Sequence, residues 1–230
     1  MNESALRDEI CRVGRSLFER GYVHATAGNI SVRLPASEGG GFLITPTDAC
    51  LGFLEPDRLA RLDDDGVQLS GERASKTIAL HRRIYAASAG TAAAAGCVIH
   101  THSTHCVALT LAGTAIDTPT GRELLPALTP YFVMKVGHVP LIGYERPGAP
   151  EAAAKAEAAI ARYHAAGTPI RAVMLERLGP NVWHDTPMTA MATLEELEET
   201  ARLWALRGPH AAPLDAAHID QLRQNFGARW

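Results

Sequence analysis

The chain has 230 residues, of which 47% are hydrophobic and 20% are charged, and this is ordinary globular usage. The length fits one domain, and we expect residues 1–230 to fold as a single unit. The formal charge is -3 and no block of Lys or Arg is present, which argues against nucleic acid or an anionic membrane as a partner.

The chain carries no pattern typical of export or membrane insertion. Its first residues, MNESALRDEI, lack the apolar core of a signal peptide, and no stretch approaches the roughly 20 consecutive apolar residues that span a bilayer. The cysteines share no CxxC spacing; they are Cys11, Cys50, Cys97 and Cys106. We therefore expect reduced thiols and a cytoplasmic protein.

The first third of the chain predicts a helix followed by a hairpin. Residues 4–20 place apolar side chains at helical spacing, with Ser4 as a candidate N-cap and Gly21 as a stop. The β-type runs NISVRL and GFLITP come next, separated by PASEGGG, whose proline and glycines favour a flexible connection. An antiparallel strand pair is the simplest interpretation.

The middle of the chain predicts a helix, a strand and another helix. A helix capped by Ser75 is expected to continue through Tyr85. The run CVIHTH is typical of a strand because its apolar residues are mostly β-branched. Ser103 can then cap a helix that Gly113 ends.

The last part of the chain predicts two more strands and three helices. HVPLIGY and RAVMLE are strand-like, whereas 150–166, 188–207 and 214–226 have helical patterns. Helices mixed with strands, including a hairpin, favour an α/β fold with a central mixed sheet covered on both faces.

Three histidines follow an apolar run in the segment GCVIHTHSTH. In an extended strand, residues two apart point to the same side about 6.5 Å from each other, so His100 and His102 can converge on one metal ion. The alternative is one buried core histidine and one exposed histidine. His105 is expected to pack or cap, because the chain changes direction before it.

The motifs around these histidines resemble one enzyme family. HATAGNISVRL resembles the Gly-Asn-x-Ser turn of the class II aldolase/adducin family, LITPTDACLG its Thr-Pro turn and ASKTIALHRRIY its Ser-led helix, and VIHTHS follows in the family's order. The resemblance implies a three-layer α/β/α sandwich with a largely antiparallel sheet. It also implies a homotetramer with sites at subunit interfaces and a divalent metal held by the histidine pair, usually Zn2+.

Further segments resemble one branch of that family. TPTDACLGFLEP, SKTIALHRRIY, TPYFVMKVGHVPLIGYERPG and LERLGPNVW look most like members that decarboxylate a 3-oxo-tetronate 4-phosphate to dihydroxyacetone phosphate and carbon dioxide. This resemblance implies a metal-dependent carboxy-lyase of sugar-acid catabolism. Its substrate would be a phosphorylated sugar acid.

The resemblance also implies a phosphate site built from turns. Its residues would be Gly28, Asn29, Thr47, Ser75 and Lys76. The Lys76 ammonium could instead serve catalysis by contacting the departing carboxylate. Exposed backbone N–H groups and the start of a helix attract a phosphate without a basic patch. Ordinary turn chemistry explains each of these motifs equally well when it is taken alone.

Two positions depart from the aldolase pattern. Thr77 stands where the aldolases have a glutamate that acts as general acid/base, and Leu178 stands where they have a third metal-binding histidine. Decarboxylation of a β-keto acid removes no hydroxyl proton, so the missing glutamate favours that reaction. By resemblance, Tyr131 reaches a neighbouring subunit's site as proton donor or orienting group; a buried ring is the alternative.

The missing histidine leaves the third metal ligand open. Candidates are Glu176, His138 and His184, and a site with two histidines, water and substrate is the other solution. Such a site favours weaker binding and admits Mn2+, Co2+ or Fe2+ in place of zinc. Alternative functions are a sugar-phosphate aldolase or epimerase, a non-catalytic adducin-like module, and an iron oxygenase that uses Glu176.

Overall fold

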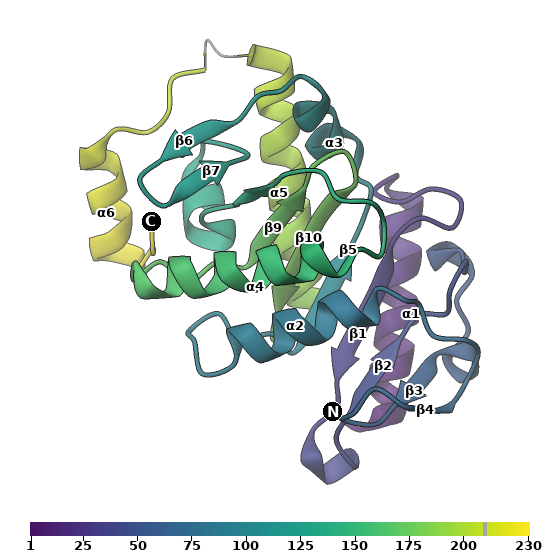
Figure 1. Cartoon of the computed structure of the whole chain (residues 1–230). Helices are drawn as coiled ribbons and strands as arrows, with labels where there is room; N and C mark the ends of the chain where they lie inside the picture. Colours follow the sequence, from purple (N-terminus) through teal and green to yellow (C-terminus); the bar gives the residue numbers. More distant parts are fainter. Residues whose placement is uncertain (209–210) are drawn as a thin grey trace.

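A computed structural model describes residues 1–208 and 211–230, and its centre is an eight-stranded sheet (Figure 1). The strand order is β4-β3-β2-β1-β5-β10-β9-β8. Only the β8–β9 pair is parallel among these strands. The strands are β1 (Asn29–Arg33), β2 (Phe42–Ile44), β3 (Ala60–Leu62), β4 (Gln68–Ser70), β5 (Cys97–His100), β8 (Leu141–Ile142), β9 (Ala172–Leu175) and β10 (Gly179–His184).

Helices cover both faces of the sheet, which confirms the predicted three-layer α/β/α sandwich (Figure 1). One face carries α1 (Glu3–Glu19), α3 (Thr104–Leu111) and α5 (Pro187–Arg207); the other carries α2 (Ile78–Ser88) and α4 (Pro150–Ala165). At the side lie the hairpin β6 (Ile116–Thr118) and β7 (Gly121–Glu123), a π-helix (Phe132–Val136) and α6 (Ala216–Phe226). No described helix is both long and apolar enough to cross a bilayer.

The predicted elements are present, but two predicted caps are wrong. The Asn2 side chain caps α1 by accepting from Ala5 N at 2.9 Å, so Ser4 lies inside the helix. Helix α2 begins at Ile78 with Thr77 at the N-cap position. Ser75 lies in the turn before it, where its N donates to the Thr45 carbonyl at 3.2 Å and its Oγ accepts from Thr77 N at 3.4 Å. The strands β3, β4, β6, β7 and β10 were not predicted.

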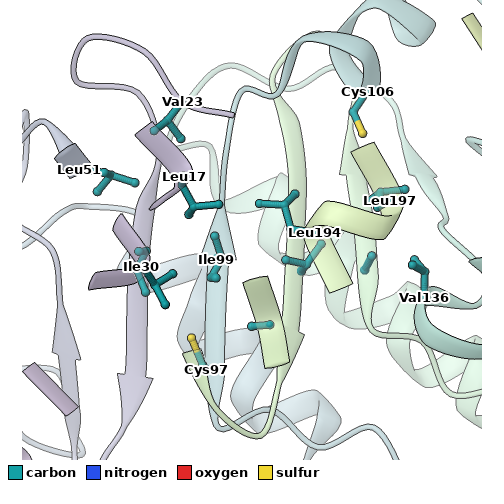
Figure 2. Packing of buried hydrophobic residues seen from close by; sticks show 14 of the residues in the cluster. Leu17, Val23, Ile30, Leu51, Cys97, Ile99, Cys106, Val136, Leu194 and Leu197 are labelled. Atoms are coloured by element: carbon teal, nitrogen blue, oxygen red, sulfur yellow. The ribbon is translucent and has the colours of Figure 1, made fainter. Parts of the chain in front are cut away.

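The sheet separates two apolar clusters, and Figure 2 shows the one on the side of α1 and α5. Alternate residues of β5 point to opposite faces: Ile99 packs with Leu17 of α1 and Leu194 of α5, whereas Val98 packs toward α2 and α4. His100 is two residues after Val98 and therefore belongs to the α2 and α4 face. The same alternation places its neighbours in the sheet, Asn29 and Asn181, on that face.

A buried polar group stands between β1 and α2. Ser31 Oγ lies 2.8 Å from both His81 Nδ1 and the Tyr85 hydroxyl, and the Tyr85 hydroxyl also donates to the Ser31 carbonyl at 2.9 Å. Burial, and after it the charge of His100, lowers the pKa of His81 from 6.5 to about 3. The imidazole is therefore neutral in the folded protein at neutral pH.

The pH dependence of stability tests this assignment. Below pH 6.5 an unfolded chain protonates this imidazole, whereas the folded protein does so only near pH 3. The free energy of unfolding should therefore fall as the pH falls through that window, and less steeply in His81→Gln. The exposed residue His164 on α4 provides a control, because His164→Gln should follow the wild type. Parallel curves of melting temperature against pH for all three proteins would contradict the assignment.

Candidate active site

Two histidines meet where β5 ends. His100 is the last residue of β5, His102 lies before α3, and their ring centres are 5.0 Å apart. His100 Nδ1 is 2.9 Å from the Pro180 carbonyl. Because a carbonyl only accepts, Nδ1 donates, and Nε2 keeps the lone pair that can bind a metal. The predicted convergence of these side chains is present in the structure.

Both imidazoles are held neutral. Burial, followed by the charge of His102, lowers the pKa of His100 to about 4. Burial also lowers the pKa of the half-buried His102, with the charge of His24 as the second cause. Neutral imidazole is the form that binds a metal, so neither ring must lose a proton at neutral pH before it binds.

Two glycines allow the backbone to close around the pair. A Cβ on Gly28, whose φ is +87°, would lie 2.8 Å from the His100 carbonyl oxygen. A Cβ on Gly179, whose φ is +139°, would lie 1.9 Å from the Thr101 carbonyl oxygen. Any larger residue would push β1 or β10 away from β5, so these glycines set how closely the three strands approach at the histidines.

A cavity of about 420 Å3 adjoins the histidines and contains most of the predicted site. The predicted residues that line it are Gly28, Asn29, Thr47, Ser75, Lys76, Thr77, His100 and His102. They come from the loops before β1 and after β2, the start of α2 and the end of β5. The fold thus brings together segments that are separated by up to about a third of the chain.

The turn before α2 presents polar side chains to this cavity. Asn29 Nδ2 donates to Thr77 Oγ1 at 3.2 Å, and Ser75 Oγ donates to the same oxygen at 3.3 Å. Asn29 Oδ1 is buried and has no protein partner within the described chain. Thr47 N already donates to the Arg73 carbonyl at 2.8 Å, which leaves the Thr47 hydroxyl as that residue's available donor. A polar ligand can occupy this turn.

The predicted substitutes for the third metal ligand lie elsewhere. The Glu176 carboxylate accepts from Tyr144 N at 2.9 Å, and His138 pairs with the buried Glu123 at 2.9 Å. His184 stands opposite Cys97, at the far end of β5. No group of three His, Cys, Asp or Glu side chains that could hold a metal is found among the described residues.

The remaining predicted residues have separate places. Leu178 lines the cavity, where an apolar side chain cannot be a ligand. His105 packs as predicted, since its ring Nδ1 and its backbone N each lie 2.8 Å from Glu198 Oε1. Tyr131 precedes the π-helix with 62% of its surface exposed and is not one of the described residues that line the cavity of its own chain.

Two site residues escaped the sequence analysis. The His24 ring centre lies 6.4 Å from that of His102, and the sequence signal was its position four residues before Gly28. Arg146 lines the cavity between β8 and α4, and the charged pair in YERPG was its signal. Arg146 and Lys76 share the lining of this cavity with the carboxylates of Asp48 and Glu145.

Comparisons with known proteins agree with this geometry. The family model described as Class II Aldolase and Adducin N-terminal domain matches residues 8–205. A 3-oxo-tetronate 4-phosphate decarboxylase of Cupriavidus necator is 50% identical over 99% of both chains. The crystal structure of Escherichia coli YgbL, described as an aldolase/epimerase/decarboxylase, superposes with a TM-score of 0.83 at 35% identity, covering 96% of this chain and 99% of that one. An L-fuculose 1-phosphate aldolase at 21% identity shares the fold, with a TM-score of 0.77 and coverage of 97% and 96%.

Replacement of Gly179 tests the close approach of β10 to the histidine turn. Gly179→Ala should lower the free energy of unfolding by roughly 2 kcal/mol or more, because its Cβ meets the Thr101 carbonyl oxygen. Gly167 also has a positive φ, +81°, but an added Cβ there would have open space. Gly167→Ala should therefore cost less, as measured by urea unfolding. Equal losses in the two variants would remove the steric argument.

Proposed function

Because the chain belongs to the class II aldolase and adducin family, we propose that it decarboxylates a 3-oxo-tetronate 4-phosphate to dihydroxyacetone phosphate and carbon dioxide. The observation that carries this proposal is the 50% identity, over 99% of both chains, with a relative of that activity. The protein is a carboxy-lyase, and its reaction belongs to sugar-acid catabolism.

Two parts of the cavity can bind the two negatively charged groups of the substrate, its phosphate and its carboxylate. The phosphate of the substrate lies in the turn formed by Asn29, Ser75 and Lys76, where hydroxyl, amide and ammonium groups donate. Arg146 lines the same cavity and can pair with the carboxylate that leaves as carbon dioxide. A volume of about 420 Å3 is small enough to hold a four-carbon phosphate closely.

The reaction breaks the bond between the carboxylate carbon and C2, and the bonding electrons move toward the C3 oxygen. A divalent cation, when bound, supplies the Lewis acid that polarises this carbonyl. C2 then takes up a proton. Because no hydroxyl proton is removed, the neutral side chain of Thr77 suffices where an aldolase needs a carboxylate. Thr77 Oγ1 accepts from Asn29 and Ser75 and so holds the phosphate turn together.

The chain's own residues fit such a cation. His100 presents Nε2, since Nδ1 is engaged by the Pro180 carbonyl, and His102 stands beside it. Zinc suits this pair, and Mn2+, Co2+ or Fe2+ are alternatives with two histidines and oxygen donors. His24 lies near His102, with ring centres 6.4 Å apart, but it does not form a group of three metal-binding side chains with the pair in the described structure. We propose that its ring moves closer when a cation binds and takes the third position that Leu178 has vacated.

The approach of His24 is sterically open. The residue is exposed on the loop before β1, its carbonyl accepts from Ala27 N at 2.9 Å, and its ring makes no hydrogen bond to a described residue. Ala25 has a positive φ of +47°, an uncommon conformation for a non-glycine residue. The His24 ring lies beside this turn, with its centre 6.4 Å from that of His102.

Assembly completes the site. We propose a homotetramer in which Tyr131 of one subunit serves the cavity of its neighbour as proton donor or orienting group. Its exposed position outside its own cavity supports this role. The aldolase alternative is less favoured because Thr77 stands where the aldolases have a glutamate. An adducin-like module is less favoured because the histidine pair and the phosphate turn are intact.

The reaction is tested by measuring carbon dioxide release against aldehyde release from 3-oxo-tetronate 4-phosphate and fuculose 1-phosphate. We expect carbon dioxide and dihydroxyacetone phosphate from the first substrate and no aldehyde from the second.

His100→Ala and His102→Ala should each reduce kcat more than about 100-fold, because a metal ligand is lost, while circular dichroism stays unchanged. Lys76→Ala should mainly raise KM. Wild-type rates in either histidine variant would overturn the site.

The role of His24 is tested by metal binding without turnover. Titration of metal-free protein with Co2+ should show about 10- to 100-fold weaker binding in His24→Ala and an altered visible absorption spectrum. His164→Ala, which removes an exposed histidine on α4, is the matched control and should bind as the wild type does. Unchanged affinity and spectrum in His24→Ala would exclude this ligand, whereas no binding by the wild type would reject the metal site itself.

A further inference from the structure

A second cavity lies at the other end of α2 from the candidate active site. It has a volume of about 260 Å3 and is bordered by Ala92 and Ala93, which follow α2, whereas Ser75 and Lys76 of the first cavity precede it. Helix α2 has 11 residues, so its ends are about 16 Å apart. The two cavities share no described lining residue. The second cavity is therefore a separate site.

Three cationic side chains line this second cavity. Lys135 comes from the π-helix, Arg171 directly precedes β9, and Arg229 follows α6. These segments are far apart in the sequence. No carboxylate side chain is found among the described residues that line the cavity. The fold therefore places three mutually repelling cations at one cavity, and no anionic side chain among the described lining residues offsets this repulsion.

The Arg171 guanidinium retains hydrogen-bonding capacity. Its Nη2 donates to the Ala92 carbonyl at 3.1 Å, whereas Nη1 is buried without a partner among the described residues. A buried donor without an acceptor costs about 1–3 kcal/mol, and more for a charged group. An anion that accepts from this guanidinium would remove that cost.

The charges near Arg171 match a doubly charged ligand. Burial lowers the pKa of Arg171, the Asp185 carboxylate opposes this effect, and the charge of Arg229 adds to it. The three cations and Asp185 together leave two positive charges. A phosphate group carries about -1.5 to -2 charges at pH 7. A volume of about 260 Å3 lies below the 300–1,000 Å3 of pockets for drug-sized ligands, so the ligand is small.

We propose that the cavity formed by Lys135, Arg171 and Arg229 is a second anion site that binds a phosphate group, either as inorganic phosphate or as a small phosphate monoester. The forked donors of the two arginines and the ammonium of Lys135 surround such a tetrahedral anion. The site is independent of the proposed decarboxylation, because none of its residues lines the first cavity.

The test is calorimetric titration of the full chain with inorganic phosphate and with glycerol 3-phosphate, which separates the two sources of the group. A Ser75→Ala, Lys76→Met variant removes the phosphate turn of the first cavity, and it should retain one binding event. Adding Arg171→Met to this variant should lower its affinity for phosphate by about tenfold or more. Arg202→Met, which removes an exposed cation of α5, is the matched control and should leave it unchanged.

A second variant is needed because Arg171→Met also removes the hydrogen bond to the Ala92 carbonyl and could change the loop after α2. Arg229→Met removes an exposed side chain and should also weaken binding several-fold while the melting temperature stays unchanged. Acetate, with one negative charge, should not bind. The proposal is overturned if the Ser75→Ala, Lys76→Met variant binds no phosphate, if Arg171→Met and Arg229→Met both bind as their parent does, or if acetate binds equally well.

Discussion

The hydrogen bond from His100 Nδ1 to the Pro180 carbonyl is the interaction on which the candidate site depends. It sets the tautomer of the imidazole, directs Nε2 toward the cavity and joins β5 to the start of β10. The bond requires the two strands to approach closely, and Gly179 permits that approach because it has no Cβ. The orientation of one nitrogen atom is therefore a consequence of how the sheet is packed.

This arrangement places polar groups in the interior beneath the cavity. Asn29, His100 and Asn181 form a row across three strands on the face covered by α2 and α4, and both side-chain polar atoms of Asn181 are buried without a partner in the described chain. Unsatisfied buried polar atoms destabilise a fold. The apolar clusters on both faces of the sheet offset this cost, and a polar ligand offsets it further.

The molecule gathers cationic side chains at its second cavity although its net charge is -3. Lys135, Arg171 and Arg229 line the second cavity, whereas Lys76 and Arg146 share the first with Asp48 and Glu145. Helix α2 separates them, with the phosphate turn before its first residue and the second cavity after its last. Because cations placed together repel, the cluster at the second cavity supports the proposed binding of a small anion there.

The sequence alone determined the layer order, the hairpin, the strand that carries the histidines and the polar part of the cavity lining between Gly28 and His102, because periodicity and turn residues act locally and the motif order over that range is specific. It could not rank Glu176, His138 and His184 as ligands, and it missed β10, whose first residues Gly179 and Pro180 are typical of a turn. Only the tertiary structure decided that those three side chains lie away from the pair, that His24 lies near it and that three distant cations meet. The physical reason is that strand register and long-range packing, which no local pattern encodes, set the distances between residues far apart in the chain.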